Sequence, residues 1–223
     1  MRAHFGWMVV CLGLAGPAKA GIWDGQWTHD LDLSAGFGSG AVTTAFRETT
    51  GFGFFDGRVK LGAGPRLFAY FGGSDVPFTT SNADLISAGR VNTLTASDAR
   101  NLALNLALSL QIRVWAGLEL GANIDVIGVG FGSTRTAQST TGAFQGPHEA
   151  SPPSFNLLTL GRSDKGTLDS EFYAAWWFDD RVAVRAGASH VVTELVTDEP
   201  LDDGNTGFRR VTTLFFIAAS YRF

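Results

Sequence analysis

One segment of the chain alternates between apolar and polar or small residues over twelve positions, and this pattern limits the possible fold more than any other feature. Residues 101–112 read NLALNLALSLQI, with leucine or isoleucine at every even position. Successive side chains of a β-strand point to opposite faces, whereas a helix would spread these leucines around its whole circumference. Leucine favours helices intrinsically, but the period of two outweighs that preference. The segment therefore predicts a strand with one apolar face and one polar face.

The same period recurs along the rest of the chain, in segments at 31–37, 59–71, 116–126, 168–178, 182–192 and 210–223. Several of these segments run 11 to 14 residues, whereas a strand of a soluble protein usually has about five or six. A strand that crosses a bilayer at a tilt needs about 9–11 residues. We therefore expect an all-β fold, an antiparallel up-and-down transmembrane β-barrel.

The two faces of these segments differ in charge. One face is apolar and nearly free of charge over its middle. The other face is expected to form a polar network in the barrel lumen, made of Asp32, Lys60, Arg66, Asn105, Glu119, Asn123, Asp125, Asp169, Glu171, Arg185 and Arg210. With Asp30 and Arg222 included, this face carries six acids and five bases. Because unpaired buried charge is costly, these nearly balanced charges predict ion pairs that plug the lumen. The alternative is a narrow polar path for ions or a small solute.

A soluble sandwich would alternate in the same way, with its polar face in water. Strand length argues against it, and so does the placement of aromatic residues. Such residues gather at strand ends beside short turns, where an interfacial girdle belongs: Trp115, Trp176, Trp177, Phe178, Tyr221 and Phe223. A secreted ligand-binding barrel is the remaining alternative.

Two short turns, 113–115 and 179–181, are expected to close hairpins. Three-residue turns would set Ile112 opposite Ala116 and Trp176 opposite Val184, which keeps apolar residues together. Short turns of such barrels are periplasmic and long connections are external, so about 72–98, 132–166 and 194–207 are expected outside. A periplasmic C-terminus then requires one more strand within 41–55, a segment that alternates poorly. The predicted total is eight strands.

The first twenty residues have the parts of a secretory signal peptide. Arg2 supplies a positive charge, Phe5–Gly16 is apolar, and Ala18-Lys19-Ala20 fits the small-x-small cleavage rule. The apolar stretch is too short to span a bilayer as a helix. We expect a signal peptide at 1–20, a mature chain from Gly21, and a barrel domain at 21–223. A buried N-terminal helix is the alternative.

The last strand ends with apolar or aromatic residues at alternate positions: Phe215, Ile217, Ala219, Tyr221 and Phe223. This ending resembles the C-terminal signal of bacterial outer-membrane barrels, which the barrel assembly machinery reads. The mature chain resembles small eight-stranded outer-membrane barrels of the OmpA-domain, OmpX and OmpW type. Residues 121–128 (GANIDVIG) also resemble a segment of uncharacterised outer-membrane β-barrel-domain proteins. The resemblance implies the outer membrane of a Gram-negative cell and specifies no activity.

Composition excludes several other classes of function. The net charge of −4 provides no basic surface for nucleic acid. The single cysteine, Cys11, cannot form an intramolecular disulfide. Outside the first twenty residues, no apolar run approaches 18 residues, so a helical membrane protein is excluded.

No catalytic, cofactor or metal site is expected. Ser189 and His190 are adjacent, so they point to opposite faces of one strand, a poor geometry for a nucleophile and its base. The acidic pairs Asp179-Asp180 and Asp202-Asp203 are interpreted as turn residues. The expected role is structural or in surface interaction, by a monomer surrounded by outer-membrane lipid. The long 132–166 connection is a candidate contact surface, no surface ligand is specified, and an outer-membrane lipid-modifying enzyme is a less favoured alternative.

Overall fold

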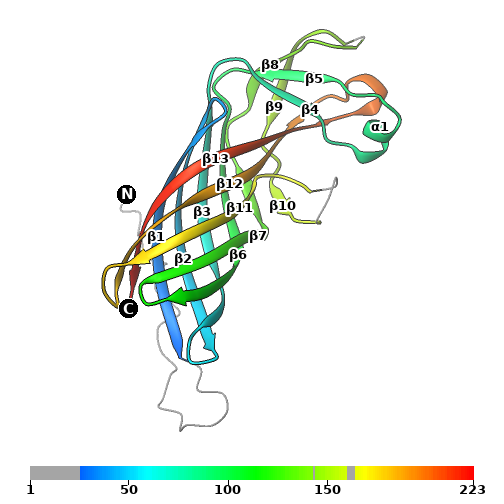
Figure 1. The fold of residues 1–223 in the computed structure, drawn as a ribbon. Coiled ribbons are helices and arrows are strands. Elements are labelled where there is room, and N and C mark those ends of the chain that lie inside the picture. The colour runs from blue at the N-terminus through cyan, green and yellow to red at the C-terminus, as the bar shows by residue number, and fades with distance from the viewer. Residues whose placement is uncertain (1–25, 143, 160–163) are drawn as a thin grey trace, which may run out of the picture.

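The computed structural model describes residues 26–142, 144–159 and 164–223 (Figure 1). These residues form an antiparallel all-β fold with thirteen strands, one short helix, α1 (Ala83–Ser87), and one 3-10 turn, η1 (Asp202–Gly204). The expected signal peptide and its cleavage site at Ala18, Ala20 and Gly21 lie outside the described residues. Within the described ranges, no helix is long and apolar enough to cross a membrane.

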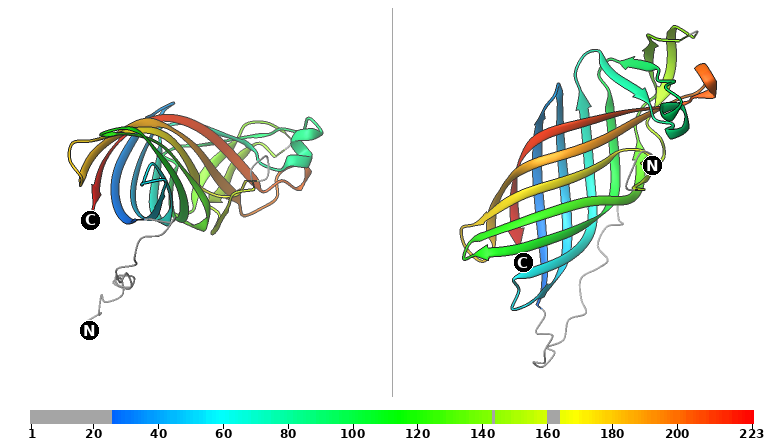
Figure 2. Two further views of the ribbon diagram at one scale, coloured as in Figure 1. Left: turned by 60° about the horizontal axis from the view of Figure 1, so that its bottom comes forward. Right: turned by 45° about the vertical axis from the view of Figure 1, so that its right-hand side comes forward.

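Eight long strands pair in a closed ring, which we call the large ring. They are β1 (Trp27–Gly38), β2 (Ala41–Phe54), β3 (Val59–Gly72), β6 (Arg100–Trp115), β7 (Leu118–Phe131), β11 (Leu168–Trp177), β12 (Val182–Thr197) and β13 (Gly207–Arg222). Each pairs antiparallel with the next in this order, and β13 returns to pair with β1. Figure 2 shows these strands curving around a common interior. Closure pairs both edges of every strand.

The period-two pattern sorts side chains between the outside and the inside of the large ring. On β6 the even positions Leu102–Ile112 are exposed by 39–45%, whereas Asn101 and Asn105 are at most 2% exposed. The same alternation runs along β13, where Phe215 and Ile217 are exposed and Ser220 is buried. The outer surface of the ring is therefore apolar and its interior polar.

The segment expected to contain a strand on grounds of parity alone does form one. β2 (Ala41–Phe54) pairs with β1 and β3 over most of its length. Its burial alternates regularly, but its residue types do not, because the buried Arg47 adjoins the exposed Glu48. Glu48 thus places a carboxylate on the otherwise apolar outer surface, which the sequence pattern did not predict.

The β6–β7 hairpin differs from the expected register. β6 continues to Trp115, and Ile112 lies opposite Leu120 rather than Ala116. The turn consists of Ala116 and Gly117, and Gly117 has φ +83°, a left-handed conformation that glycine adopts without strain. The partner of Ile112 is shifted by four residues, an even number, so apolar residues still face apolar residues.

The second hairpin has the expected register. Trp176 lies opposite Val184, and the Phe178 N–H donates to the Val182 carbonyl at 2.9 Å. The carboxylate of Asp179 accepts hydrogen bonds from two backbone N–H groups of this turn, both at 2.7 Å. Asp179 therefore shapes the turn.

An irregularity in β7 exchanges the two faces of that strand near its middle. Leu106 pairs with Ile127 and Ala107 with Asp125, so Val126 is an extra residue without a partner on β6. A single inserted residue moves the following side chains to the other face. After Val126 the outward side chains are at the odd positions Ile127, Val129 and Phe131. Continuing the even-numbered outward face of 116–126 would have placed them inside.

Most of the expected aromatic girdle lies on the outer surface at the end of the ring that carries the short turns. The exposed members are Trp115, Trp176, Phe178, Tyr221 and Phe223. Trp177 points to the interior instead, where the guanidinium of Arg222 lies 3.8 Å from its ring centroid. Adjacent strand residues face opposite ways, so Trp176 and Trp177 cannot both be in the girdle.

The long connections contain the remaining strands, β4 (Val76–Thr80), β5 (Thr93–Ala96), β8 (Arg135–Ser139), β9 (Gly146–Ser151) and β10 (Phe155–Leu157). β10 pairs with β7. The other four link the ends of β13 and β12 in the order β13–β4–β5–β8–β9–β12. Because β12 and β13 also pair with each other, these six strands form a second, small ring beyond one end of the large ring (Figure 1).

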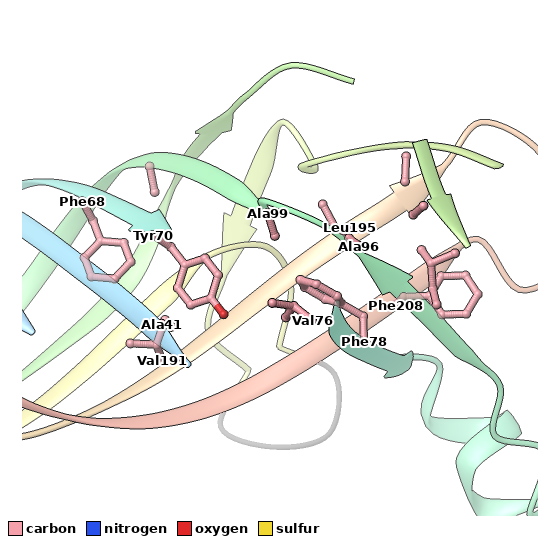
Figure 3. Packing of buried hydrophobic residues seen from close by; sticks show 14 of the residues in the cluster. Ala41, Phe68, Tyr70, Val76, Phe78, Ala96, Ala99, Val191, Leu195 and Phe208 are labelled. Atoms are coloured by element: carbon pink, nitrogen blue, oxygen red, sulfur yellow. The ribbon is translucent and has the colours of Figure 1, made fainter. Parts of the chain in front are cut away.

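The small ring has an apolar core of its own. Figure 3 shows Phe78, Leu195 and Phe208 directed into it, and all three are fully buried. The cluster continues through Val76 to Tyr70 at the end of the large ring. The connections that were expected to be loops therefore pack as a folded layer.

The assignment of faces predicts opposite tolerance at neighbouring positions. Leu106→Arg places a charge on the apolar outer surface and should lower the free energy of unfolding by about 2–4 kcal/mol in lipid vesicles. Leu106→Ile, the matched apolar control, should change it by less than about 1.5 kcal/mol. Equal effects in a denaturant titration would contradict the assignment.

Asn105, on the inner face of the same strand, is held by three hydrogen bonds. The Asn105 amide donates to Asp125 at 2.8 Å and to the Thr167 carbonyl at 3.0 Å, and its oxygen accepts from Asn156 at 2.8 Å. A serine cannot replace these three hydrogen bonds. We expect Asn105→Ser to lower the free energy of unfolding by about 1–3 kcal/mol, the cost of unsatisfied buried polar groups, in the same titration.

Candidate functional site

The interior of the large ring holds a network of buried ion pairs, which is the candidate functional site. Ten of the eleven residues expected in the lumen are buried, namely Asp32, Lys60, Arg66, Asn105, Glu119, Asn123, Asp125, Asp169, Glu171 and Arg185. Their contacts join strands that are not neighbours in the ring, such as β3 with β11 and β1 with β12. Such contacts pass across the interior rather than along the sheet.

Arg66 is the centre of this network. Its guanidinium is 2.5 Å from Glu171 and 3.5 Å from Asp125, and it also contacts Asp169. Arg66 is 1% exposed. A buried cation that faces three carboxylates is stabilised by charge-assisted hydrogen bonds, which are stronger than those between neutral groups.

A second group of contacts continues from Glu171 towards β1. Arg185 lies 3.1 Å from Glu171 and 2.7 Å from Asp32. Asp32 also accepts from Arg47 Nε at 3.0 Å. The guanidinium of Arg185 lies 3.8 Å from the centroid of the Tyr173 ring, so its face is covered as well as its edges.

The two predicted asparagines hold carboxylates of this network. Asn105 donates to Asp125, as described above, and Asn123 donates to Glu171 at 2.6 Å. Asp169 accepts from the Ser189 hydroxyl at 2.5 Å. These neutral donors occupy acceptor sites that the arginines leave open.

A separate group lies nearer the short turns. Lys60 is 3.1 Å from Glu119, and Arg222 is 2.7 Å from Asp30 and 3.7 Å from Glu119. Lys60, Glu119, Arg222 and Trp177 are among the residues that line a pocket of about 510 Å³ at this end of the ring. The pocket opens beside the turn at Ala116 and Gly117.

Two residues of the network differ from the sequence expectation. Arg210 is half-buried and donates to the Ser39 carbonyl at 2.6 Å and to Thr212 at 3.1 Å, outside the described ion pairs. Sequence reasoning missed Arg47, which is buried and paired with Asp32. The signal that could have identified Arg47 was the parity argument, which requires one face of 41–55 to line the interior.

The interior contains four carboxylates and three guanidiniums in its central part, from Asp32, Asp125, Asp169, Glu171, Arg47, Arg66 and Arg185. If every group is ionised, this part carries one excess negative charge. Ion pairing thus compensates most, but not all, of the buried charge.

The other residues that could serve catalysis or metal binding do not lie together. Ser189 is buried in the network, whereas His190 is on the outer face of β12. His29 contacts Thr50, and His148 contacts the Phe144 carbonyl. No group of three or more His, Cys, Asp or Glu residues that could hold a metal ion occurs among residues 26–142, 144–159 and 164–223.

Comparisons with known proteins give distant likenesses. No family model matches the chain, and no curated protein sequence matches it. Among solved structures, Neisserial surface protein A (NspA) aligns over 88% of this chain and 94% of its own, with 8% identity and a TM-score of 0.37. The CymD monoaromatic hydrocarbon channel aligns over 89% and 87%, with 8% identity and a TM-score of 0.24.

The toluene transporter TodX of P. putida aligns over 89% of this chain and 79% of its own, with 11% identity and a TM-score of 0.23. All three TM-scores are below 0.5. The description of the fold therefore rests on the strand pairings of this chain alone.

Removing the central cation should be far more costly than breaking an exposed ion pair. Arg66→Met leaves three buried carboxylates without their shared partner and should lower the free energy of unfolding by about 3–5 kcal/mol. The exposed Arg90–Asp203 pair, 2.5 Å apart, provides the control, and Arg90→Ala should cost less than about 1 kcal/mol. Denaturant titration in lipid vesicles measures both values, and similar values would contradict the proposed importance of Arg66.

Proposed function

We propose that this chain is an outer-membrane β-barrel protein of a Gram-negative cell, whose eight-stranded large ring spans the membrane. The observation that carries the proposal is a closed ring that is apolar outside and filled with paired charges inside. A water-soluble barrel would turn its charges outward. The segment Leu102–Ile112 extends about 33 Å along its strand, which at a tilt of about 40° matches an apolar band roughly 25 Å tall.

The proposed role is structural or in surface interaction, without catalysis. Its support is the small ring, which gives the long connections a shared buried core instead of leaving them as separate loops. β12 and β13 run from one ring into the other. The large ring would then anchor a rigid platform that faces the outside of the cell, with the short turns and the C-terminal signal on the periplasmic side.

A narrow channel for ions or small solutes is the second candidate. Its support is the polar space at both ends of the network: the 510 Å³ pocket described above, and one of about 620 Å³ that includes Glu194 and Lys165 at the other end. Among the described residues, Thr49 Oγ1 and Arg47 Nη1 are also buried without a hydrogen-bond partner. Water would satisfy such groups.

Planar bilayers distinguish the two candidates. A lumen closed by Arg66 and its partners should give no steady conductance steps. Arg66→Met should create a pathway, with a preference for cations because the carboxylates then outnumber the bases further. Steady conductance steps from the wild-type protein would contradict a closed lumen and support the channel.

The platform role predicts that the small ring resists proteases as one unit. Phe78 is fully buried in its core, and Phe78→Ala should cost about 3–5 kcal/mol locally. We expect faster cleavage within 72–98 and 132–159, while the large ring stays folded by circular dichroism. Val91→Ala, at an exposed position of the same region, is the control and should leave cleavage unchanged. Equal cleavage of wild type and Phe78→Ala would contradict a cooperative platform.

A further inference from the structure

Two arginines lie next to each other at the end of the large ring that carries the long connections. Arg100 is the first residue of β6, and it is exposed on the outer face of that strand, one outward position beyond Leu102. Arg135 is the first residue of β8 and is half-buried. Its guanidinium donates to the Asp98 carbonyl, and to the Arg100 carbonyl at 3.4 Å. The Arg135 side chain therefore reaches from the small ring to the end of β6.

No carboxylate contacts this pair of guanidiniums directly. Within the described residues, neither arginine forms an ion pair. Asp98 gives Arg135 a backbone carbonyl, and Asp75 accepts a serine hydroxyl at 3.2 Å. Glu149 accepts from Thr136, which adjoins Arg135 on β8, and adjacent strand residues face opposite ways. The pair thus lacks a bound counterion within the described chain.

The two cations are close enough to affect each other. Burial lowers the pKa of the Arg135 guanidinium and the charge of Arg100 lowers it further, whereas the Asp98 carboxylate raises it. Both guanidiniums stay charged, because arginine does not lose its proton in proteins. An anion that contacts both of them would relieve their repulsion.

The surface next to the pair, towards the middle of the outer face, is apolar. Phe71 of β3 lies opposite Arg100, and Phe131 of β7 lies opposite Leu102. These three apolar side chains are exposed by 40–42%. They continue into the row of outward leucines on β6. A molecule that is complementary to both parts has an anionic head joined to an apolar chain.

We propose that Arg100 and Arg135 bind the phosphate group of a membrane lipid, whose acyl chains lie along Leu102 and its apolar neighbours. The inference rests on the proposed transmembrane placement, which puts this end of the ring in the outer leaflet. A phosphate monoester carries a charge of about −1.5 to −2 at pH 7 and has three acceptor oxygens. Each guanidinium has five N–H donors in a fork that matches phosphate geometry.

A lipid fits these features better than a free phosphate ion or an acidic protein does. A free ion leaves the apolar side chains beside the pair uncovered, and a water-soluble partner would have to enter the headgroup region to reach them. Basic residues at the level of the headgroups attract anionic lipids, by about fivefold in binding for each Lys or Arg. The two arginines and the apolar surface together therefore select an anionic amphiphile.

The test compares two lipids at this site, in phosphatidylcholine vesicles that contain the full mature chain. The chain has only Cys11, within the expected signal peptide, so Leu104→Cys can carry a fluorophore at the next outward position after Leu102. Quenching by phosphatidic acid with a nitroxide on its acyl chain is compared with quenching by phosphatidylcholine that carries the same nitroxide. The ratio gives the relative association constant, and we expect phosphatidic acid to be preferred several-fold.

Substitutions then locate the preference. Arg100→Gln should reduce it about fivefold, and this variant should fold because the Arg100 side chain makes no hydrogen bond or ion pair within the described residues. Arg135→Gln should have a similar effect, whereas Arg100→Lys keeps the charge and should retain most of the preference. Arg90→Gln is the matched control, because Arg90 is paired with Asp203 away from this site, and it should change nothing.

Glycerol phosphate shares the phosphate monoester but lacks acyl chains, so it separates the two sources of phosphate. At millimolar concentration it should not displace phosphatidic acid, and displacement would overturn the lipid as the occupant. A chain that fails to insert into vesicles contradicts the proposed function. A chain that inserts but shows no preference, or that keeps its preference in Arg100→Gln, overturns only the phosphate site.

Discussion

Each long strand of this protein separates two environments, and the other features of the structure depend on that separation. Because alternate side chains face opposite ways, the same twelve residues of β6 supply an apolar outer surface and a polar inner one. Closing the ring then confines the polar side chains to a narrow interior. Charges in such a space must pair with one another, which explains why Arg66 meets three carboxylates there.

The sequence predicted this separation because a period of two is a local property. It also predicted which face would hold the charges, and ten of the eleven named polar residues are buried. The one exception, Arg210, has a physical cause. Arg210 lies where β13 leaves the large ring, so its side chain contacts the β1–β2 turn at Ser39 instead of the central carboxylates. Period alone does not tell where along a strand the ring ends.

The register of the hairpins, and the pairing of strands that are far apart in the sequence, were harder to predict from the sequence. The turn at Gly117 shifts which residues of β6 and β7 lie opposite each other, and so does the extra residue Val126. The alternation of residue types along each strand gives no sign of either shift. The small ring was missed for a different reason. Its four short strands, β4, β5, β8 and β9, come from two separate connections, so each alone resembles a polar loop. Only the buried cluster that includes Phe78, Leu195 and Phe208 shows that they fold together with β12 and β13.

Arg47 and Glu48 show how two different solutions arise at adjacent positions. Both belong to the segment that alternated poorly, because charged residues next to each other conceal the face that each one occupies. Arg47 points inward and is paired with Asp32. Glu48 points outward, where the described residues give it no hydrogen bond or ion pair. Pro65 lies at the gap in the β2–β3 pairing and has no N–H to donate. The same strand therefore pairs one charge across the interior and leaves the next one on the outer surface, because adjacent residues of a strand face opposite ways.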